Sequence, residues 1–178
     1  MKKNFTLLLI LISSLGSFSQ PNQDDPNLID KAKIQVKLAD GKQKLYTYNY
    51  RGALLVFREI LAVDQNNATA NFRIAQCHFG LNQFDKALKY AEKAQKLDPK
   101  VDKELPFVLA ECNHRLGNLD IAKEQYTKFK ATLSASKAKE YAIDELIAQT
   151  DYAKEAMKNP IDVIIENLGT KINTTNPE

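Results

Sequence analysis

The chain has 178 residues, of which 44% are hydrophobic and 26% are charged, and its formal net charge at pH 7 is +3. Lys2 and Lys3 lie in residues 1–19, which hold no acidic residue and which we expect to be cleaved, so the remaining chain carries +1. A near-neutral chain lacks the clustered basic face that neutralises phosphates, so we expect no nucleic-acid partner. The remaining length suits one domain with a hydrophobic core.

Residues 1–19 have the pattern of a secretory signal peptide. A basic start precedes an apolar run over residues 5–15, and Ser17-Phe18-Ser19 then places small residues where signal peptidase reads them, so we expect cleavage before Gln20. The alternative is an uncleaved anchor, which the short run disfavours because spanning takes about 20 apolar residues. No cysteine follows the run, which argues against a lipoprotein. The sequence predicts an exported protein without a transmembrane segment after cleavage.

Residues 20–27 are polar and contain two prolines, which predicts a short mobile leader in which Asp25-Pro26 caps and starts a helix. Apolar residues at helical spacing then predict three pairs of helices over residues 28–46 and 48–63, 68–81 and 84–97, and 103–116 and 119–133. The first pair is the least regular, since Gly41 weakens its first helix.

Turn and cap residues separate these helices. Asn82-Gln83 and Gly117-Asn118 are the predicted turns inside the second and third pairs. Asn67 is the predicted N-cap of the third helix. Asn67-Ala68-Thr69 also fits the pattern of a glycosylation acceptor, but an exported bacterial protein favours the cap.

The chain after residue 133 predicts an end helix and a strand-like tail. Ser134 and Ser136 offer a start for one long helix over residues 137–157, whose apolar face and polar back suit the closing element of a helical array. Pro160 ends it, and residues 161–165 are β-branched and half alternating, which is a strand pattern.

Three alanines mark an internal repeat. Ala53, Ala87 and Ala122 lie 34 and 35 residues apart, and each begins a similar series of small and aromatic residues. A period in this range is typical of stacked helical hairpins, because one hairpin cannot bury its apolar face alone. Such an array binds other chains and is rarely an enzyme.

The three hairpins resemble tetratricopeptide repeats (TPRs) over residues 34–133. The matching residues are Gly41, Tyr50, Ala53, Phe57 and Ile60 in the first hairpin, Ile74, Ala75, His78, Ala87, Ala91, Ala94 and Pro99 in the second, and Leu109, Ala110, Gly117, Leu119, Ala122, Tyr126 and Phe129 in the third. The chain departs from the pattern at Asn71, which stands in place of tryptophan, and at Asp40 and Lys44. The resemblance implies an all-α, right-handed TPR solenoid of three helical hairpins over residues 28–158, with an end helix and a short strand-like tail.

The same resemblance implies a concave groove lined by the first helix of each hairpin, which would bind a protein or peptide ligand. The implied lining residues are Lys42, Leu45 and Tyr46, then Thr69, Phe72, Gln76 and Phe79, then Glu104, Phe107, Glu111, His114 and Arg115. Exposed Phe72, Phe79 and Phe107 would suit an extended peptide or a partner helix. The alternative is that these rings pack beneath the end helix or another domain. Phe72 and Gln76 replace residues with which chaperone-binding TPRs grip a carboxylate.

The end of the chain carries a second resemblance. Asn159-Pro160, Asn167-Leu168-Gly169 and Ile172-Asn173-Thr174 resemble the junction of bacterial envelope proteins that join TPRs to a WD-like β-propeller and an OmpA-like peptidoglycan-binding domain. This implies that residues 159–178 begin a propeller-like domain, that the chain is an outer-membrane-associated N-terminal module, and that peptidoglycan binds only through a domain absent here. The alternative is a free-standing periplasmic TPR adaptor in secretion or outer-membrane assembly. A third class of function, an envelope hydrolase regulated by its repeats, is supported by no residue in the sequence.

Thiol and imidazole groups occur at Cys77, His78, Cys112 and His114 alone. A zinc site or a Cys–His nucleophile is disfavoured, because adjacent helical residues point about 100° apart and no third residue orients the pair. We therefore predict no catalytic residue, no metal site and no cofactor, and a packed role for His78. The cysteines occupy equivalent positions about 10 Å apart, beyond the roughly 7 Å of a disulfide, which predicts two buried free thiols with a disulfide as the alternative.

Overall fold

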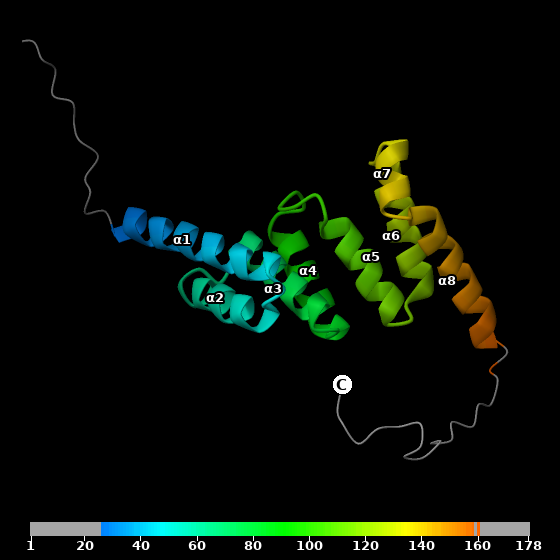
Figure 1. The fold of residues 1–178 in the computed structure, drawn as a ribbon, viewed down its shortest axis with the longest axis horizontal. Coiled ribbons are helices and arrows are strands. Elements are labelled where there is room, and N and C mark those ends of the chain that lie inside the picture. Colours follow the sequence, from blue (N-terminus) through cyan, green and yellow to red (C-terminus); the bar gives the residue numbers. More distant parts are fainter. Residues whose placement is uncertain (1–25, 159, 161–178) are drawn as a thin grey trace, which may run out of the picture.

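A computed structural model describes residues 26–158 and residue 160, and the described residues form eight α-helices and no strand. Three hairpins follow one another along the molecule and two further helices complete the stack (Figure 1). The helices are α1 (Pro26–Tyr46), α2 (Tyr50–Val63), α3 (Ala68–Gly80), α4 (Phe84–Leu97), α5 (Leu105–Arg115), α6 (Leu119–Ala131), α7 (Ala135–Glu140) and α8 (Ile143–Lys158).

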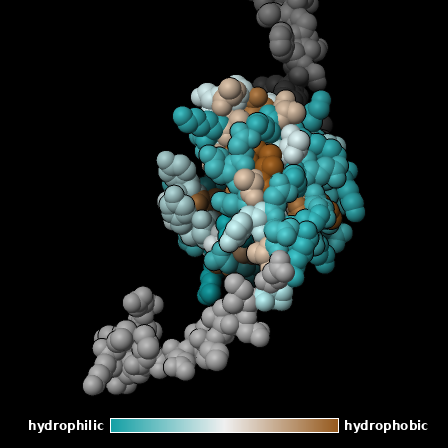
Figure 2. Space-filling model, turned by 90° about the vertical axis from the view of Figure 1, so that its right-hand side faces the viewer, coloured by the Kyte–Doolittle hydropathy of each residue, from teal (hydrophilic) through white to brown (hydrophobic). Residues whose placement is uncertain are grey.

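The all-α, right-handed solenoid of three hairpins is confirmed. The predicted signal peptide, most of the leader and the strand-like tail over residues 161–165 lie outside the described residues, and α1 begins at the predicted Pro26. None of the helices that the structure describes combines the length and the hydropathy needed to cross a bilayer. Seen from the end formed by α8, the surface is mainly hydrophilic (Figure 2).

Cap and turn residues set the boundaries of the second and third hairpins as predicted. The Oδ1 atom of Asn67 accepts a hydrogen bond from the backbone N–H of Ala70 at 2.9 Å, which caps α3. Asn82, with φ of 56°, and Gly117, with φ of 79°, lie in the left-handed region that ends a helix and that asparagine and glycine adopt most readily. The sequence therefore places these hairpin turns through residues that favour the required backbone.

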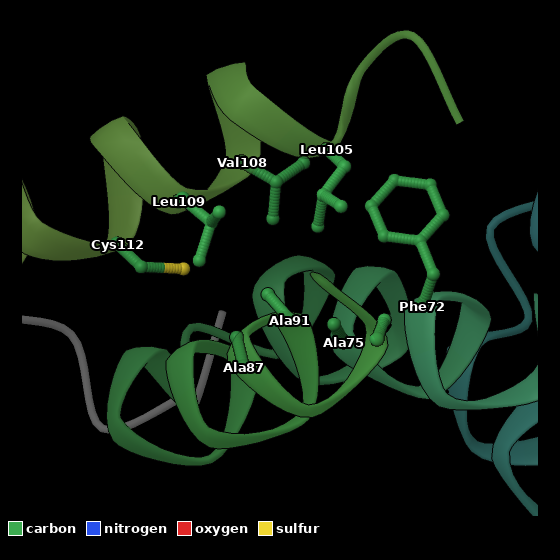
Figure 3. Close-up of a cluster of buried hydrophobic side chains, with 9 residues drawn as sticks. Phe72, Ala75, Ala87, Ala91, Leu105, Val108, Leu109 and Cys112 are labelled. Carbon is green, nitrogen blue, oxygen red and sulfur yellow. The ribbon is translucent and has the colours of Figure 1, made fainter. Parts of the chain in front are cut away.

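The described core consists of three apolar clusters, two where neighbouring hairpins meet and one where the third hairpin meets the end helices. In the middle cluster Ala87, Ala91 and Ala94 lie one turn apart on α4 and present only methyl groups. A row of apolar side chains from α5 faces these methyl groups, and Phe72 of α3 lies at one end of the row (Figure 3). That row is Leu105, Val108, Leu109 and Cys112. The small residues thus let α5 approach the preceding hairpin closely.

Gly41 has a packing role in the first hairpin. A Cβ atom at this position would lie 2.4 Å from Cε1 of Phe57, which is completely buried at the centre of the first cluster. Because a real Cβ essentially never comes this close to another heavy atom, only glycine allows α1 to lie against the ring. The residue that weakens the helix locally is therefore the one that permits its packing.

The prediction of a single end helix over residues 137–157 is wrong. The chain forms α7 and α8 with a break at Tyr141 and Ala142, and Ala142 has φ of 51°, which no α-helix contains. The start at Ser134 is confirmed, because its Oγ accepts a hydrogen bond from the N–H of Lys137.

The break allows two apolar residues to face the third hairpin together. The ring of Tyr141 packs against Phe107 and Phe129, with centroid distances of 4.9 and 5.3 Å, and Ile143 is fully buried in the same cluster. In a continuous helix, residues two positions apart point about 200° apart, so only one of Tyr141 and Ile143 could face α6.

We predict that Gly41→Ala destabilises the fold. Alanine gains about 1 kcal/mol of helix propensity over glycine. Overpacking against the completely buried Phe57 ring should cost about 2–3 kcal/mol, the upper part of the usual range, so the free energy of unfolding should fall by roughly 1–2 kcal/mol. Urea unfolding followed by circular dichroism measures it. The control is Lys31→Ala, an exposed position on the same helix. A Gly41→Ala variant as stable as the parent would contradict the close approach.

Candidate functional site

The first helices of the hairpins line a hollow of about 580 Å³, which we call the N-terminal hollow. Three hairpins contribute to it, and the residue after α7 borders it. Its lining residues are Lys42, Leu45 and Tyr46 of α1, Tyr50 of α2, Arg73, Gln76, Phe79 and Gly80 of α3, Glu104, Phe107 and Val108 at the start of α5, and Tyr141.

A second hollow of about 380 Å³, the C-terminal hollow, lies between α5 and α8. Its lining residues are Glu111, His114 and Arg115 of α5, Gly117 and Leu119 at the following turn, and Leu146, Gln149, Ala153 and Met157 of α8. The first half of α5 faces one hollow and the second half faces the other. Glu104, Phe107, Glu111 and His114 are spaced three and four residues apart, so the two hollows lie along one face of α5, and we call them together the groove.

A hydrogen-bonded network joins α3 to the chain that leads into α5 across the N-terminal hollow. The guanidinium of Arg73 donates to Asp102 at 2.9 Å and to Gln76 at 2.7 Å, and the Gln76 amide donates to Glu104 at 3.4 Å. The Arg73 and Asp102 side chains are 18% and 17% exposed. Nε of Arg73 is buried and has no hydrogen-bond partner among the described residues. The polar part of the hollow is thus held in place before a ligand arrives.

Aromatic rings supply the apolar part of the N-terminal hollow. Phe107 lies against Tyr141, and Phe79 packs edge-on against Phe84 with ring centroids 5.5 Å apart. Both phenylalanines are half-buried, so each is fixed by the core on one side and open to the hollow on the other. Tyr46 is 84% exposed at the rim.

A buried carboxylate organises the C-terminal hollow. Glu111 is only 6% exposed, accepts a hydrogen bond from the hydroxyl of buried Tyr126, and lies 3.6 Å from the Arg115 guanidinium. Burial, and then the hydrogen bond to Glu111, raise the pKa of Tyr126 above its usual range, so its hydroxyl stays protonated and donates. Nδ1 of His114 lies 3.3 Å from the same hydroxyl.

Comparison with known proteins gives the family context. Residues 47–128 match the family described as anaphase-promoting complex, cyclosome, subunit 3. The chain is also 30% identical over 84 residues to human Tetratricopeptide repeat protein 28, a match that covers 47% of this chain and 3% of that protein. The chain thus spans a small part of that relative.

Solved structures agree on the fold. The Yersinia enterocolitica type III secretion chaperone SycD, in complex with a peptide of the translocator YopD, has a TM-score of 0.59 at 17% identity, covering 69% of this chain and 95% of that one. The Sgt2 TPR domain from Aspergillus fumigatus has a TM-score of 0.57 at 18% identity, and the match covers 78% of this chain and 93% of that domain. The TPR2B domain of yeast Sti1, in a complex with pHsp70, has a TM-score of 0.58 at 17% identity, and the match covers 68% of this chain and 98% of that domain.

The described residues have the fold of a TPR array. Within this TPR array, ten of the twelve predicted groove residues line one of the two hollows. The seven in the N-terminal hollow are Lys42, Leu45, Tyr46, Gln76, Phe79, Glu104 and Phe107, and the three in the C-terminal hollow are Glu111, His114 and Arg115. Thr69 is half-buried and lines neither hollow.

The predicted exposure of Phe72 is wrong. Phe72 is completely buried and packs in the middle cluster beside Leu105, under a cation–π contact from the neighbouring Arg73 guanidinium. Residues next to each other on a helix point about 100° apart, so when Arg73 and Gln76 face the hollow, Phe72 faces the core. Phe107 combines both alternatives weighed for it, since it packs against Tyr141 in the predicted end segment and also lines the hollow. Phe79 lines the hollow as predicted, and its other side packs against Phe84 of α4.

Sequence reasoning predicted Gln76 and Glu104 but missed Arg73, which lies at the polar centre of the N-terminal hollow. Arg73, Gln76 and Gly80 are spaced three and four residues apart on α3, which is the spacing of one helical face, and Arg73 is the only arginine on that helix. This spacing could have revealed the face. Tyr141 offered no such signal, because its position depends on the break before α8.

His78 has the packed role predicted for it. The side chain is 2% exposed, its Nδ1 lies 2.8 Å from Oε1 of Gln83, and its ring stacks on Tyr90 with centroids 5.6 Å apart. Burial lowers its pKa, so the ring is neutral near pH 7. Among the described residues no group of three histidine, cysteine or carboxylate side chains could hold a metal ion.

The two thiols are free and buried, as predicted, and they lie in different clusters. Burial raises the pKa of Cys77 and of Cys112 from the usual 9.0 to about 12. The thiolate, which is the nucleophile, is therefore scarce at neutral pH in the folded protein.

We predict that neither thiol reacts with dithionitrobenzoate at pH 8 until the protein unfolds, because a pKa of about 12 leaves only about one thiolate in ten thousand. The same shift makes unfolding release protons, so the stability contributed by both thiols should fall as pH rises from 9 to 12. Absorbance at 412 nm, with and without guanidinium, measures the reaction. Rapid labelling of the native protein would overturn this account.

Proposed function

We propose that this TPR scaffold holds an extended segment, or a helix, of another protein along its groove. The observation that carries the proposal is the position of α5, whose two halves face the two hollows, so that a ligand lying across α5 contacts both. Aromatic rings and charges of both signs occur together in the groove, which is typical of peptide recognition.

The charges suggest the chemistry of the ligand. Lys42 and Arg115 are exposed, one in each hollow, and half-buried Glu104 lies beside the rings of the first. Phe79 and Phe107 offer apolar contacts in the first hollow, which Lys42 also lines. A segment with apolar anchor residues and neighbouring acidic residues complements these groups.

Structures with the same fold support a peptide ligand. The SycD structure contains a peptide of YopD, the PcrH structure contains the chaperone-binding region of PopD, and the first TPR of Spaghetti is bound to an HSP90 peptide. In each of them the bound partner is a peptide or a binding region of another protein. The carboxylate-gripping residues of chaperone-binding TPRs are replaced here by Phe72 and Gln76, so we propose recognition through apolar anchors.

Filling the N-terminal hollow should abolish peptide binding. Peptides selected against the parent from a random twelve-residue library, and titrated by fluorescence anisotropy, should bind Gln76→Trp at least about tenfold more weakly, because the ring occupies the ligand's space. The control is Gln95→Trp, the same change on the exposed side of α4. Peptides that bind both variants equally well, or a selection that yields no binder, would count against the groove.

We further propose that the chain works in the cell envelope of a bacterium, as the N-terminal TPR module of an OmpA-like, outer-membrane-associated protein. The support is the leader pattern of residues 1–19 and the junction-like residues Asn167-Leu168-Gly169 and Ile172-Asn173-Thr174. Peptidoglycan would then bind through another domain. The alternative is a free-standing periplasmic adaptor, which the fold it shares with secretion chaperones favours.

The size of the native polypeptide distinguishes these two contexts. An antibody raised against residues 68–132 should detect, in cell-envelope fractions, a band well above the 20.1 kDa of this chain if it is the front module of a longer protein. A band near that mass in the periplasmic fraction would favour the adaptor. A band in the cytoplasmic fraction alone would contradict both.

A further inference from the structure

The outward side of α1 carries an apolar stripe that no described residue covers. Its members recur at alternating intervals of three and four residues, the spacing of a coiled-coil seam. We call this the outer stripe, and it consists of Ile29, Ala32, Val36, Ala39, Gln43 and Tyr46. Gln43 is its polar member, and Tyr46, at its end, also lies at the rim of the N-terminal hollow. Ile29 is 41% exposed, Val36 71% and Tyr46 84%.

The outer stripe lies opposite the side of α1 that packs in the solenoid. Leu38 is buried against the first hairpin, and Ile34, Gly41 and Leu45 accompany it. At about 100° per residue, these four positions centre roughly 170° away from Val36 and Ala39. A helix that approaches the outer stripe therefore meets α1 without meeting α2.

The two ends of the solenoid differ. The α8 end is mainly hydrophilic (Figure 2), as the closing face of a repeat array should be. The α1 end instead presents alanines between larger apolar residues, the arrangement that brings α4 and α5 together inside the stack. The first turns of α1 also extend beyond α2 (Figure 1), because α1 has 21 residues and α2 has 14.

We infer that the outer stripe is a self-association surface, on which α1 of a second copy lies antiparallel to the first about a two-fold axis. With the axis between residues 37 and 38, Val36 meets the partner's Ala39, and each Ile29 meets the partner's Tyr46. Large side chains thus meet small ones at the centre of the seam, which lets the helices approach closely. A two-fold contact closes on itself and yields a dimer.

Charge complementarity selects the second copy and this orientation. In heptad notation the members of the outer stripe occupy the a and d positions, with Ile29 at a. Lys33 and Asp40 then both occupy e positions, and the e positions of two antiparallel helices face each other. In the proposed register each Lys33 lies about two residues, roughly 3 Å along the axis, from the partner's Asp40, so two ion pairs form. On the other side Gln35 meets the partner's Lys42, and no like charges meet.

A parallel pair would lack these ion pairs, because the e positions of one helix then face the g positions of the other. Lys33 would lie opposite the partner's Leu28, and Asp40 would lie opposite the partner's Gln35. Lys33 and Asp40 are at present paired only within α1, to Asp30 at 3.6 Å and to Lys44 at 2.6 Å, and all four side chains are at least 35% exposed. Exposed pairs of this kind exchange partners at little cost.

Sedimentation equilibrium of the exported chain, purified from a bacterial host, tests the inference. The mass should rise with concentration to twice that of the monomer and no further. Val36→Glu should leave a monomer, because it places a charge in the seam, whereas the control Val63→Glu, at a 62% exposed valine of α2, should dimerise as the parent does. Far-UV circular dichroism verifies that both variants fold.

Charge reversal tests the register. Lys33→Glu alone or Asp40→Lys alone replaces two attractions with two repulsions and should weaken dimerisation about tenfold, while the double variant should return to within about threefold of the parent. A monomer at every concentration, an open series of larger oligomers, or single reversals without effect would overturn the proposal. Because none of these changes touches Gln76 or the floor of the groove, failure here leaves the peptide-binding proposal separately testable.

Discussion

The stack depends on methyl-sized side chains where its helices cross. Ala87, Ala91 and Ala94 leave nothing larger than a Cβ between the backbone of α4 and the apolar residues of α5. Each hairpin in such an array contacts only its neighbours, so the spacing set at one crossing fixes the position of everything beyond it. The geometry of the groove is therefore decided by residues that do not line it.

The groove combines a fixed polar centre with half-buried rings, and both follow from the way α3 and α5 pack. Phe79 and Phe107 are held on one side by the apolar clusters, so they present a surface without losing much side-chain freedom when a ligand binds. Arg73 is held by Gln76 and Asp102. Preorganisation of this kind suits a scaffold, since it limits the entropy that binding must overcome.

Features encoded within one turn of the chain could be predicted from the sequence, and features that depend on distant contacts could not. The cap at Asn67 and the turns at Asn82 and Gly117 follow from local backbone preferences. The burial of Phe72 depends instead on the rotation of α3, which is set by what packs against its other side. Likewise, the break at Ala142 stabilises the fold only through the contacts that it lets Tyr141 make with residues of α5 and α6.

The ion pair between Arg73 and Asp102 has a mechanical consequence. It spans the boundary between the second and third hairpins on the inner side of the superhelix, where bending changes distances most. Opening the groove at this boundary would separate the two charges, so the ion pair resists a change in the angle between the second and third hairpins. A partner too thick for the groove would have to break this pair before it could enter.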